Sequence, residues 1–532
     1  MSQPGGMASL QQRLHAAVQA KNWMAAAAVL REMLALQPGN AELLIQLSYM
    51  ESGAGNYRAA RQAIIDAAAR PPRQAEAMGD LMARLRTFNE AQVLDGLIHR
   101  LGPIDRIPIP LLIQAGAQWS YLNEQARALR LLDEAKRGDP DYPPTLLART
   151  QVLTYLGRVD DAQSDIDRVI RRAPQIAQAH WLRARLRKQT HDANHVSQIR
   201  QELQRPNRSP GDLSLLAFAL HKELDDLGDV AGAWTALSDA CRAKRATLPY
   251  GSDDSRRLVD ALVQLPADKS AAPAPDALGS PPMPIFIVGM HRSGTSLLEQ
   301  LLSGHEDVLA TGELYDFTCA MRYGANHHCR GVIDQEIVAR AGQVDFEEVG
   351  RRYLDGVAWR LNGQRLFSDK LPSNFLNIGF ICRALPQAKI LHLVRDPMET
   401  CFSNLRELFS DANAYSYDMA ELADYFLQYR RLMAHWHERF PGRILDVRYD
   451  ALTGDTDAAM REVAAFCGLD YRESMSDPDA NWRAIATASA MQVRGGVVRR
   501  REPKWWPYRE QLAPLAEALL AGGVSFEQPS AA

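Results

Sequence analysis

The chain lacks several features that would identify its class at once. In its 532 residues, no apolar run approaches the roughly 18 residues that a membrane-spanning helix needs. Its six cysteines are scattered without paired spacing, which argues against a disulfide framework. The first residues, Met-Ser-Gln-Pro-Gly-Gly, lack the basic and apolar pattern of a signal sequence. From these absences we expect a cytoplasmic protein that does not bind membranes.

An excess of one charge is missing as well. The 61 lysines and arginines nearly balance the 64 aspartates and glutamates, which leaves a net charge of -3. A protein that binds nucleic acid through its overall charge would be basic, so nucleic acid is not an expected partner. Any anion site must therefore be local. The chain is also longer than one hydrophobic core usually covers, so we expect two or three domains.

Small residues recur in the N-terminal half with a period of about 34 residues. The repeated position is Ala in four repeats and the larger Leu94 in one, and the four alanines are Ala26, Ala60, Ala128 and Ala162. Prolines that would end helices keep the same period, at Pro38, Pro72, Pro140 and Pro174. This pattern resembles the tetratricopeptide repeat. It predicts an all-α solenoid of paired helices over residues 7–205.

A solenoid of this kind buries the apolar faces of neighbouring repeats against each other and leaves a concave groove outside. The resemblance therefore implies a protein or peptide partner bound by the array. Two alternatives stay open, because no groove residue can be recognised from sequence. The array could be a structural spacer, or it could be a dimerisation arm that makes the protein a homodimer.

The composition changes twice after the repeats. Residues 206–266 still have helical character and predict a bridge, whereas residues 267–282 are rich in Pro, Ala and Ser and predict a linker. A second domain is expected over residues 283–520. Its predicted strands are 285–288, 308–311, 366–369, 388–394 and 444–449, with helices such as 346–361 and 419–439 between them. This alternation is typical of an α/β domain with a central parallel sheet, which binds ligands at the carboxyl ends of its strands.

The first of these strands runs into a glycine-rich turn. Gly289 and Gly294 have the spacing of a phosphate-binding loop, and a helical stretch follows the turn. The N-terminus of a helix favours an anion, because its backbone N–H groups are unpaired. Further donors are expected from side chains of the loop, namely Arg292, Ser293, Thr295 and Ser296. However, Thr295 stands where a nucleotide triphosphatase needs Lys.

A second charged turn follows the predicted strand at 388–394, with Arg395 at the strand end and Ser403 in the next helix. Together with the glycine-rich loop, this turn resembles the sulfotransferase family, in the version found in its tyrosylprotein sulfotransferase branch. The repeats ahead of it resemble bacterial tetratricopeptide-sulfotransferase proteins. The resemblance implies the co-substrate 3′-phosphoadenosine 5′-phosphosulfate (PAPS). Residues 289–296, including His291, would hold its 5′ phosphosulfate, and Arg395 and Ser403 its 3′ phosphate.

The same resemblance assigns roles to other residues. Glu313 would be the general base, while Lys370 and Arg292 would stabilise developing charge and Ser489 would approach the sulfuryl oxygens. Tyr449 and Lys504 would contact the nucleotide. No metal is expected, because a sulfuryl group carries less charge than a phosphoryl group. Residues 495–498, Gly-Gly-Val-Val, depart from the family pattern, which leaves acceptor selection open.

We therefore predict a sulfotransferase that moves a sulfuryl group from PAPS to an acceptor hydroxyl, which a protein tyrosine would supply. A nucleotide kinase or triphosphatase built on the Gly289 loop is one alternative. A tetratricopeptide scaffold with a catalytically silent sulfotransferase-like domain is the other.

Overall fold

The structure, a computed structural model, describes residues 4–266, 282–478 and 502–527. It divides into two compact units, each made of two stretches of chain. The first unit contains Met1–Pro140 and Tyr315–Asn362, and the second contains Asp141–Leu314 and Gly363–Ala532. Among the described residues, no helix combines the length and the hydropathy that a membrane span requires.

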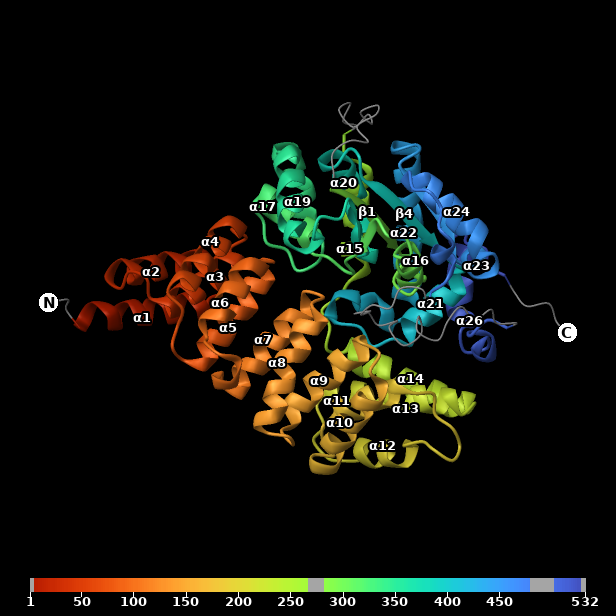
Figure 1. Cartoon of the computed structure of the whole chain (residues 1–532), viewed down its shortest axis with the longest axis horizontal. Coiled ribbons are helices and arrows are strands. Elements are labelled where there is room, and N and C mark those ends of the chain that lie inside the picture. The colour runs from red at the N-terminus through yellow and green to blue at the C-terminus, as the bar shows by residue number, and fades with distance from the viewer. Residues whose placement is uncertain (1–3, 267–281, 479–501, 528–532) are drawn as a thin grey trace. The chain divides into compact units, whose positions relative to one another are not determined.

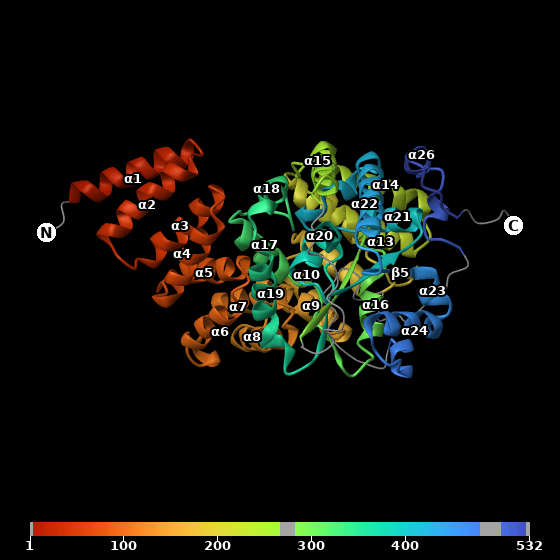
Figure 2. The same cartoon turned by 90° about the horizontal axis from the view of Figure 1, so that it is seen from above.

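The first unit is built of helices that follow one another in pairs (Figures 1 and 2). Its N-terminal stretch contains α1 (Pro4–Gln19), α2 (Trp23–Leu36), α3 (Ala41–Gly53), α4 (Tyr57–Ala69), α5 (Ala75–Thr87), α6 (Ala91–Arg100), α7 (Ile109–Tyr121) and α8 (Gln125–Gly138). Its second stretch contains α17 (Asp316–Ala325), α18 (Gln335–Arg340) and α19 (Phe346–Leu361). Helical pairs therefore fill the N-terminal part of the chain, as the repeat predicts.

The periodic small residues lie where neighbouring helices touch. Ala26, Ala60 and Ala128 are fully buried, each in the second helix of its pair, and Leu94 is fully buried at the same position of α6. The periodic prolines follow helix ends, as Pro38 does after α2. Since a buried alanine lets two helices approach closely, the period of the sequence becomes the period of helix packing.

The stretch Tyr315–Asn362 interrupts the predicted second domain and packs within the first unit. Arg58 of α4 donates to the carbonyl oxygens of Tyr323 and Gly324 at 2.8 and 2.9 Å. The ring of Tyr57 stacks on His328 with 5.8 Å between centroids. The predicted boundary at residue 283 therefore does not coincide with a division between compact units, and the domain assignment itself stays a prediction.

In the described residues of the second unit, five parallel strands form one sheet in the order β2-β3-β1-β4-β5. They are β1 (Met283–Gly289), β2 (Val308–Ala310), β3 (Leu366–Asp369), β4 (Lys389–Val394) and β5 (Ile444–Arg448). All five predicted strands are confirmed. Figure 1 shows β1 and β4 side by side. In the strand order, β2 and β3 lie on one side of β1, whereas β4 and β5 lie on the other. This topological switch is where open α/β sheets bind their ligands.

Helices cover the sheet on both faces. Around it lie α16 (Thr295–Leu302), α20 (Ile378–Ala384), α21 (Pro397–Leu405), α22 (Met419–Arg439), α23 (Tyr449–Gly454), α24 (Thr456–Cys467) and α26 (Ala513–Ala521). On one face, Ile285 and Ile287 of β1 share a core with Leu298 of α16 and Val463 of α24. Successive strand residues point to opposite faces. β1 is therefore buried on both sides, which explains its unbroken apolar sequence.

Further helices complete the second unit, and they are α9 (Pro143–Tyr155), α10 (Val159–Arg172), α11 (Ala177–Leu186), α12 (Val196–Leu203), α13 (Pro210–Asp226), α14 (Val230–Arg245) and α15 (Ser252–Val263). The last three make up most of the predicted bridge, and ion pairs join them to the helices of the sheet. Asp225 lies 2.7 Å from Arg406, and Arg245 makes two bonds of 2.8 Å with Glu421. The bridge is therefore packed into the second unit.

We expect the substitution Leu94→Ala to destabilise the first unit by about 2–5 kcal/mol, because it opens a cavity at a fully buried position. The measurement is the midpoint of the first thermal unfolding transition. Leu36→Ala is the matched control, since Leu36 is 51% exposed and its truncation should change stability by less than about 0.5 kcal/mol. Equal midpoints for the two variants would contradict the packing role of Leu94.

Candidate active site

The loop between β1 and α16, which the sequence predicts to bind phosphate, contains two glycines with positive φ angles. Gly289 and Gly294 adopt φ angles of +150° and +114°, which side-chain-bearing residues rarely adopt. A Cβ atom on Gly294 would lie 2.5 Å from Cδ2 of Tyr449, and one on Gly289 would lie 2.8 Å from the carbonyl oxygen of Leu393. The loop is therefore pressed against β4 and α23, and both glycines are required for this approach.

The polar groups of this loop fit a phosphate or sulfate group. The hydroxyl oxygen of Ser293 is buried and has no hydrogen-bond partner within the described part of the chain. Thr295 and Ser296 are the first two residues of α16, so they lie at the helix N-terminus, the end of a helix that favours an anion. A bound anion would satisfy these donors, whereas a plain strand-to-helix turn would leave the Ser293 hydroxyl unexplained.

Arg292 connects the two predicted anion motifs. It is buried and has a φ angle of +66°, in the left-handed region. Its Nε donates to the Ser403 hydroxyl at 3.3 Å, and its carbonyl oxygen accepts from Arg395 at 3.2 Å. Glu407 approaches its guanidinium to 3.6 Å. Burial lowers the pKa of Arg292, while Glu407 acts in the opposite direction. The tertiary structure thus brings three of the predicted anion-binding residues together.

The predicted nucleotide contacts lie around Arg395. Its guanidinium lies over the Tyr449 ring, 4.4 Å from the centroid, and pairs with Glu399 at 2.6 Å. The other oxygen of Glu399 accepts a hydrogen bond from the backbone N–H of Lys504. Glu399 therefore holds the predicted closing segment beside the predicted 3′ phosphate motif, although the sequence did not single this residue out.

The predicted general base and the predicted catalytic lysine form an ion pair. Lys370 Nζ lies 2.7 Å from Glu313 Oε1, and Lys370 is fully buried while the Glu313 side chain is 31% exposed. Glu313 follows β2 and Lys370 follows β3, which are neighbouring strands. A partly exposed carboxylate beside a buried ammonium group can accept a proton from an incoming hydroxyl while the lysine stabilises negative charge.

His291 belongs to the loop and interacts electrostatically with this ion pair. Burial lowers its pKa to about 4, with Glu313 raising it and Lys370 and Arg292 lowering it further. The imidazole is therefore neutral near pH 7. Its Nδ1 lies 3.2 Å from the Tyr415 hydroxyl, and its carbonyl oxygen accepts from Asn404 at 2.7 Å. A neutral His291 adds no further positive charge to a site that already contains two arginines and a lysine.

Sequence reasoning missed Glu299, which lies on α16 and is almost completely buried. Its Oε1 accepts from the backbone N–H of Gly312 at 2.9 Å and from the Ser368 hydroxyl at 2.7 Å. Glu299 thereby ties the helix after the predicted phosphate-binding loop to the turn that carries Glu313. A signal was present in the sequence, because this Glu interrupts an otherwise leucine-rich helix face.

The remaining predicted residue, Ser489, and the departure at residues 495–498 lie outside the described residues.

Residues 284–473 match the family described as "Sulfotransferase family". This matched segment, which is similar to the sulfotransferase family, contains the loop, Glu313, Lys370, Arg395 and Ser403. The roles of the individual residues remain predictions.

Known proteins resemble larger or smaller parts of the chain. An Aquifex aeolicus protein described as "Uncharacterized protein" is 27% identical over 417 residues, which cover 76% of this chain and 54% of that protein. The chain thus spans about half the length of that relative. A Caenorhabditis briggsae protein described as "Putative protein-tyrosine sulfotransferase" is 24% identical over 42% of this chain and 80% of its own length. A solved sulfotransferase from Alicyclobacillus acidocaldarius aligns with 20% identity and a TM-score of 0.27 over 46% of this chain and 96% of that structure.

We expect Glu299→Ala to loosen the turn that carries Glu313. Loss of a buried hydrogen-bond acceptor costs about 1–3 kcal/mol, so amide hydrogen exchange in residues 310–314 should accelerate at least about fivefold. Glu299→Gln is the matched control, because an amide oxygen can still accept from Gly312 and Ser368. If both variants exchange like the unchanged protein, Glu299 does not hold this turn.

Proposed function

We propose that this protein is a PAPS-dependent sulfotransferase whose acceptor is a hydroxyl group, with a protein tyrosine as the substrate class. One observation carries the proposal. The two anion motifs meet at Arg292, and the Glu313–Lys370 ion pair stands at the carboxyl ends of β2 and β3 in the same sheet. A site that binds a nucleotide with two separate anionic groups and activates a hydroxyl needs both parts.

Each part has a separate task. The loop at residues 289–296 would bind the 5′ phosphosulfate, and Arg395 with Ser403 would bind the 3′ phosphate. PAPS supplies the sulfuryl group when bound. Glu313 would accept the proton of the attacking hydroxyl, and the ammonium group of Lys370 would stabilise charge on the oxygen that leaves. Such preorganised electrostatic stabilisation is commonly the largest catalytic contribution.

Phosphoryl transfer from ATP is the competing hypothesis for this loop. Phosphate-loop nucleotidases use a Lys of the loop with Mg²⁺ to neutralise a triphosphate. Here Thr295 occupies that position, as the first residue of α16.

The other competing hypothesis, a catalytically silent scaffold, is disfavoured by the Glu313–Lys370 ion pair. An apolar pair would stabilise the fold at least as well as this buried lysine with its partly exposed carboxylate, so stability alone does not explain the ion pair.

Fewer observations support a protein tyrosine as the acceptor than support sulfuryl transfer itself. The Caenorhabditis briggsae relative, which is 24% identical over 234 residues, has a description that names protein tyrosine as the acceptor. A tyrosine hydroxyl must lose its proton as it attacks, which suits a carboxylate base. Glu313 has the exposure that a large acceptor requires, since almost a third of its side chain is open to solvent.

We expect Arg292→Ala to weaken binding of 3′-phosphoadenosine 5′-phosphate at least about 100-fold, because a charge-assisted hydrogen bond at a buried site is lost. Glu313→Gln should bind this nucleotide normally and lose at least about 100-fold in sulfuryl transfer. Isothermal titration calorimetry and transfer of labelled sulfate from PAPS measure the two effects. Arg461→Ala, at an exposed arginine of α24, is the matched control. A Glu313→Gln variant with normal turnover would remove the assignment of the base.

We also propose that the N-terminal helices bind a segment of the acceptor protein. Neighbouring helices α3, α5 and α7 carry paired tyrosines and arginines. Arg84 lies over Tyr49 at 4.2 Å and Arg86 over Tyr121 at 4.5 Å from the ring centroids. Both tyrosines are exposed, Tyr121 by 67%. Exposed aromatic rings beside guanidinium groups are typical of protein-binding surfaces.

The double substitution Tyr49→Ala with Tyr121→Ala should raise the KM for a protein acceptor at least about tenfold and leave the turnover of a small phenol unchanged. Leu520→Ala, at an exposed apolar residue of the second unit, is the control. Sedimentation of the same double variant tests the alternative that this face joins two copies of the chain. Unchanged KM together with loss of a dimer would assign the face to self-association.

A further inference from the structure

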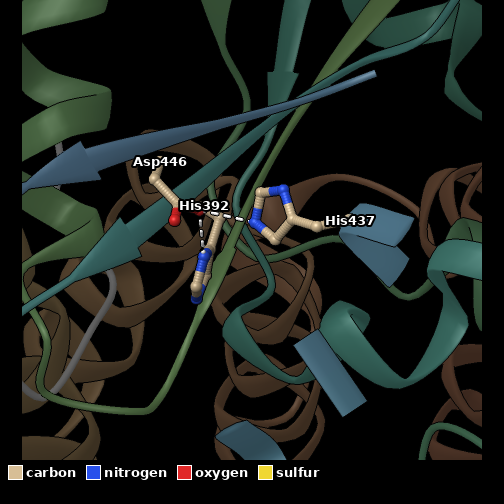
Figure 3. Close-up of side chains that lie close together, drawn as sticks. All are labelled: His392, His437 and Asp446. Carbon is tan, nitrogen blue, oxygen red and sulfur yellow. Dashed lines mark hydrogen bonds and ion pairs between the residues drawn. The ribbon is translucent and has the colours of Figure 1, made fainter. Parts of the chain in front are cut away.

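Three side chains of types that can bind a metal ion converge on the face of the sheet covered by α22 (Figure 3). His392 lies in β4, Asp446 lies in β5, and His437 lies in the last turn of α22. His392 and Asp446 are register partners on adjacent parallel strands, so their side chains project from the same face. Three rigid elements thus supply one residue each.

The donor atoms are close enough to share one ion. His392 Nδ1 lies 2.7 Å from Asp446 Oδ1, and His437 Nε2 lies 2.8 Å from the same oxygen. The three donor atoms all lie within 4.8 Å of one another. Ligands of a tetrahedral zinc ion, bound at about 2.0–2.2 Å, are separated by roughly 3.3–3.6 Å. Small side-chain rotations therefore convert this cluster into a coordination sphere, and Figure 3 shows both imidazole rings directed at the carboxylate.

Burial and secondary contacts are arranged as in a binding site. His392 is almost fully buried, and its Nε2 is hydrogen-bonded to the Tyr429 hydroxyl, which holds the ring in place. The side chains of His437 and Asp446 are 36% and 50% exposed, so an ion can enter from solvent. Metal-binding histidines characteristically use their second nitrogen in such a hydrogen bond.

We propose that His392, His437 and Asp446 bind a divalent transition-metal ion of the zinc class. Two imidazole nitrogens and one carboxylate oxygen suit such an ion, and water would complete the coordination from the open side. On binding, each neutral imidazole keeps its proton on the nitrogen that faces away from the ion, so His392 donates from Nε2 to the Tyr429 oxygen. The ion would join β4, β5 and α22, and its role is structural.

This inference is independent of sulfuryl transfer, and it contrasts with the expectation from sequence that the chain holds no metal. The simpler alternative is a hydrogen-bonded cluster in which Asp446 accepts from both imidazoles and no ion is bound. If an ion is bound, the side chains of His437 and Asp446 contribute to zinc affinity. If the cluster is only hydrogen-bonded, they do not.

The test is titration of the metal-free full-length chain with ZnCl₂ by calorimetry, together with the visible absorption of a Co²⁺-loaded sample. We expect one ion per chain, and at least a tenfold loss of affinity in His437→Ala and in Asp446→Asn. His435→Ala is the matched control, because this histidine lies on the same helix outside the cluster and its loss should change affinity less than twofold. Zinc should raise the melting temperature of the control and of neither ligand variant.

Circular dichroism without metal establishes that each variant is folded, which is expected because both substituted side chains are partly exposed. Absence of saturable zinc binding by the unchanged chain would overturn the proposal. It would equally fail if the ligand variants bound zinc as tightly as the control, and the cluster would then be a hydrogen-bonded network only.

Discussion

The buried guanidinium of Arg292 is the constraint on which the candidate site depends. A charge removed from water is costly unless partners surround it, and here the partners come from separate parts of the chain. Its side chain reaches Ser403 and approaches Glu407, while its carbonyl oxygen holds Arg395. The glycine loop, the turn after β4 and helix α21 therefore have to adopt their positions together. Gly289 and Gly294 permit this by allowing the loop to press against β4 and Tyr449.

A second buried cation organises the other half of the site in the same way. Lys370 is fully buried, and Glu313 is the carboxylate that lies against its ammonium group. Glu299 then holds the Gly312 amide beside Glu313, so the position of the carboxylate is coupled to the helix that begins at the predicted phosphate-binding loop. Nucleotide binding and hydroxyl activation, in the proposed function, would thus share one framework of buried polar contacts.

Much of the architecture could be predicted because it rests on local patterns. The alanine and proline period gave the helix pairs, and apolar runs bounded by turns gave all five strands. The glycine spacing and the charged turn after β4 located the anion motifs. Glu299 and Glu399 escaped notice because a Glu on a helix is usually a solvated residue. Their roles depend on hydrogen bonds to Gly312, Ser368 and Lys504, which are distant in sequence.

The sequence by itself determined the helical repeats, the parallel strands and the positions of the two predicted anion motifs, because periodicity, glycine spacing and residue type act over a few neighbouring positions. Only the tertiary structure decided that Tyr315–Asn362 packs within the first unit, that Glu313 pairs with Lys370, and that His392, His437 and Asp446 meet. The physical reason is strand register and helix packing. These bring together residues from separate elements, and no short-range pattern in the chain encodes which of them will be neighbours.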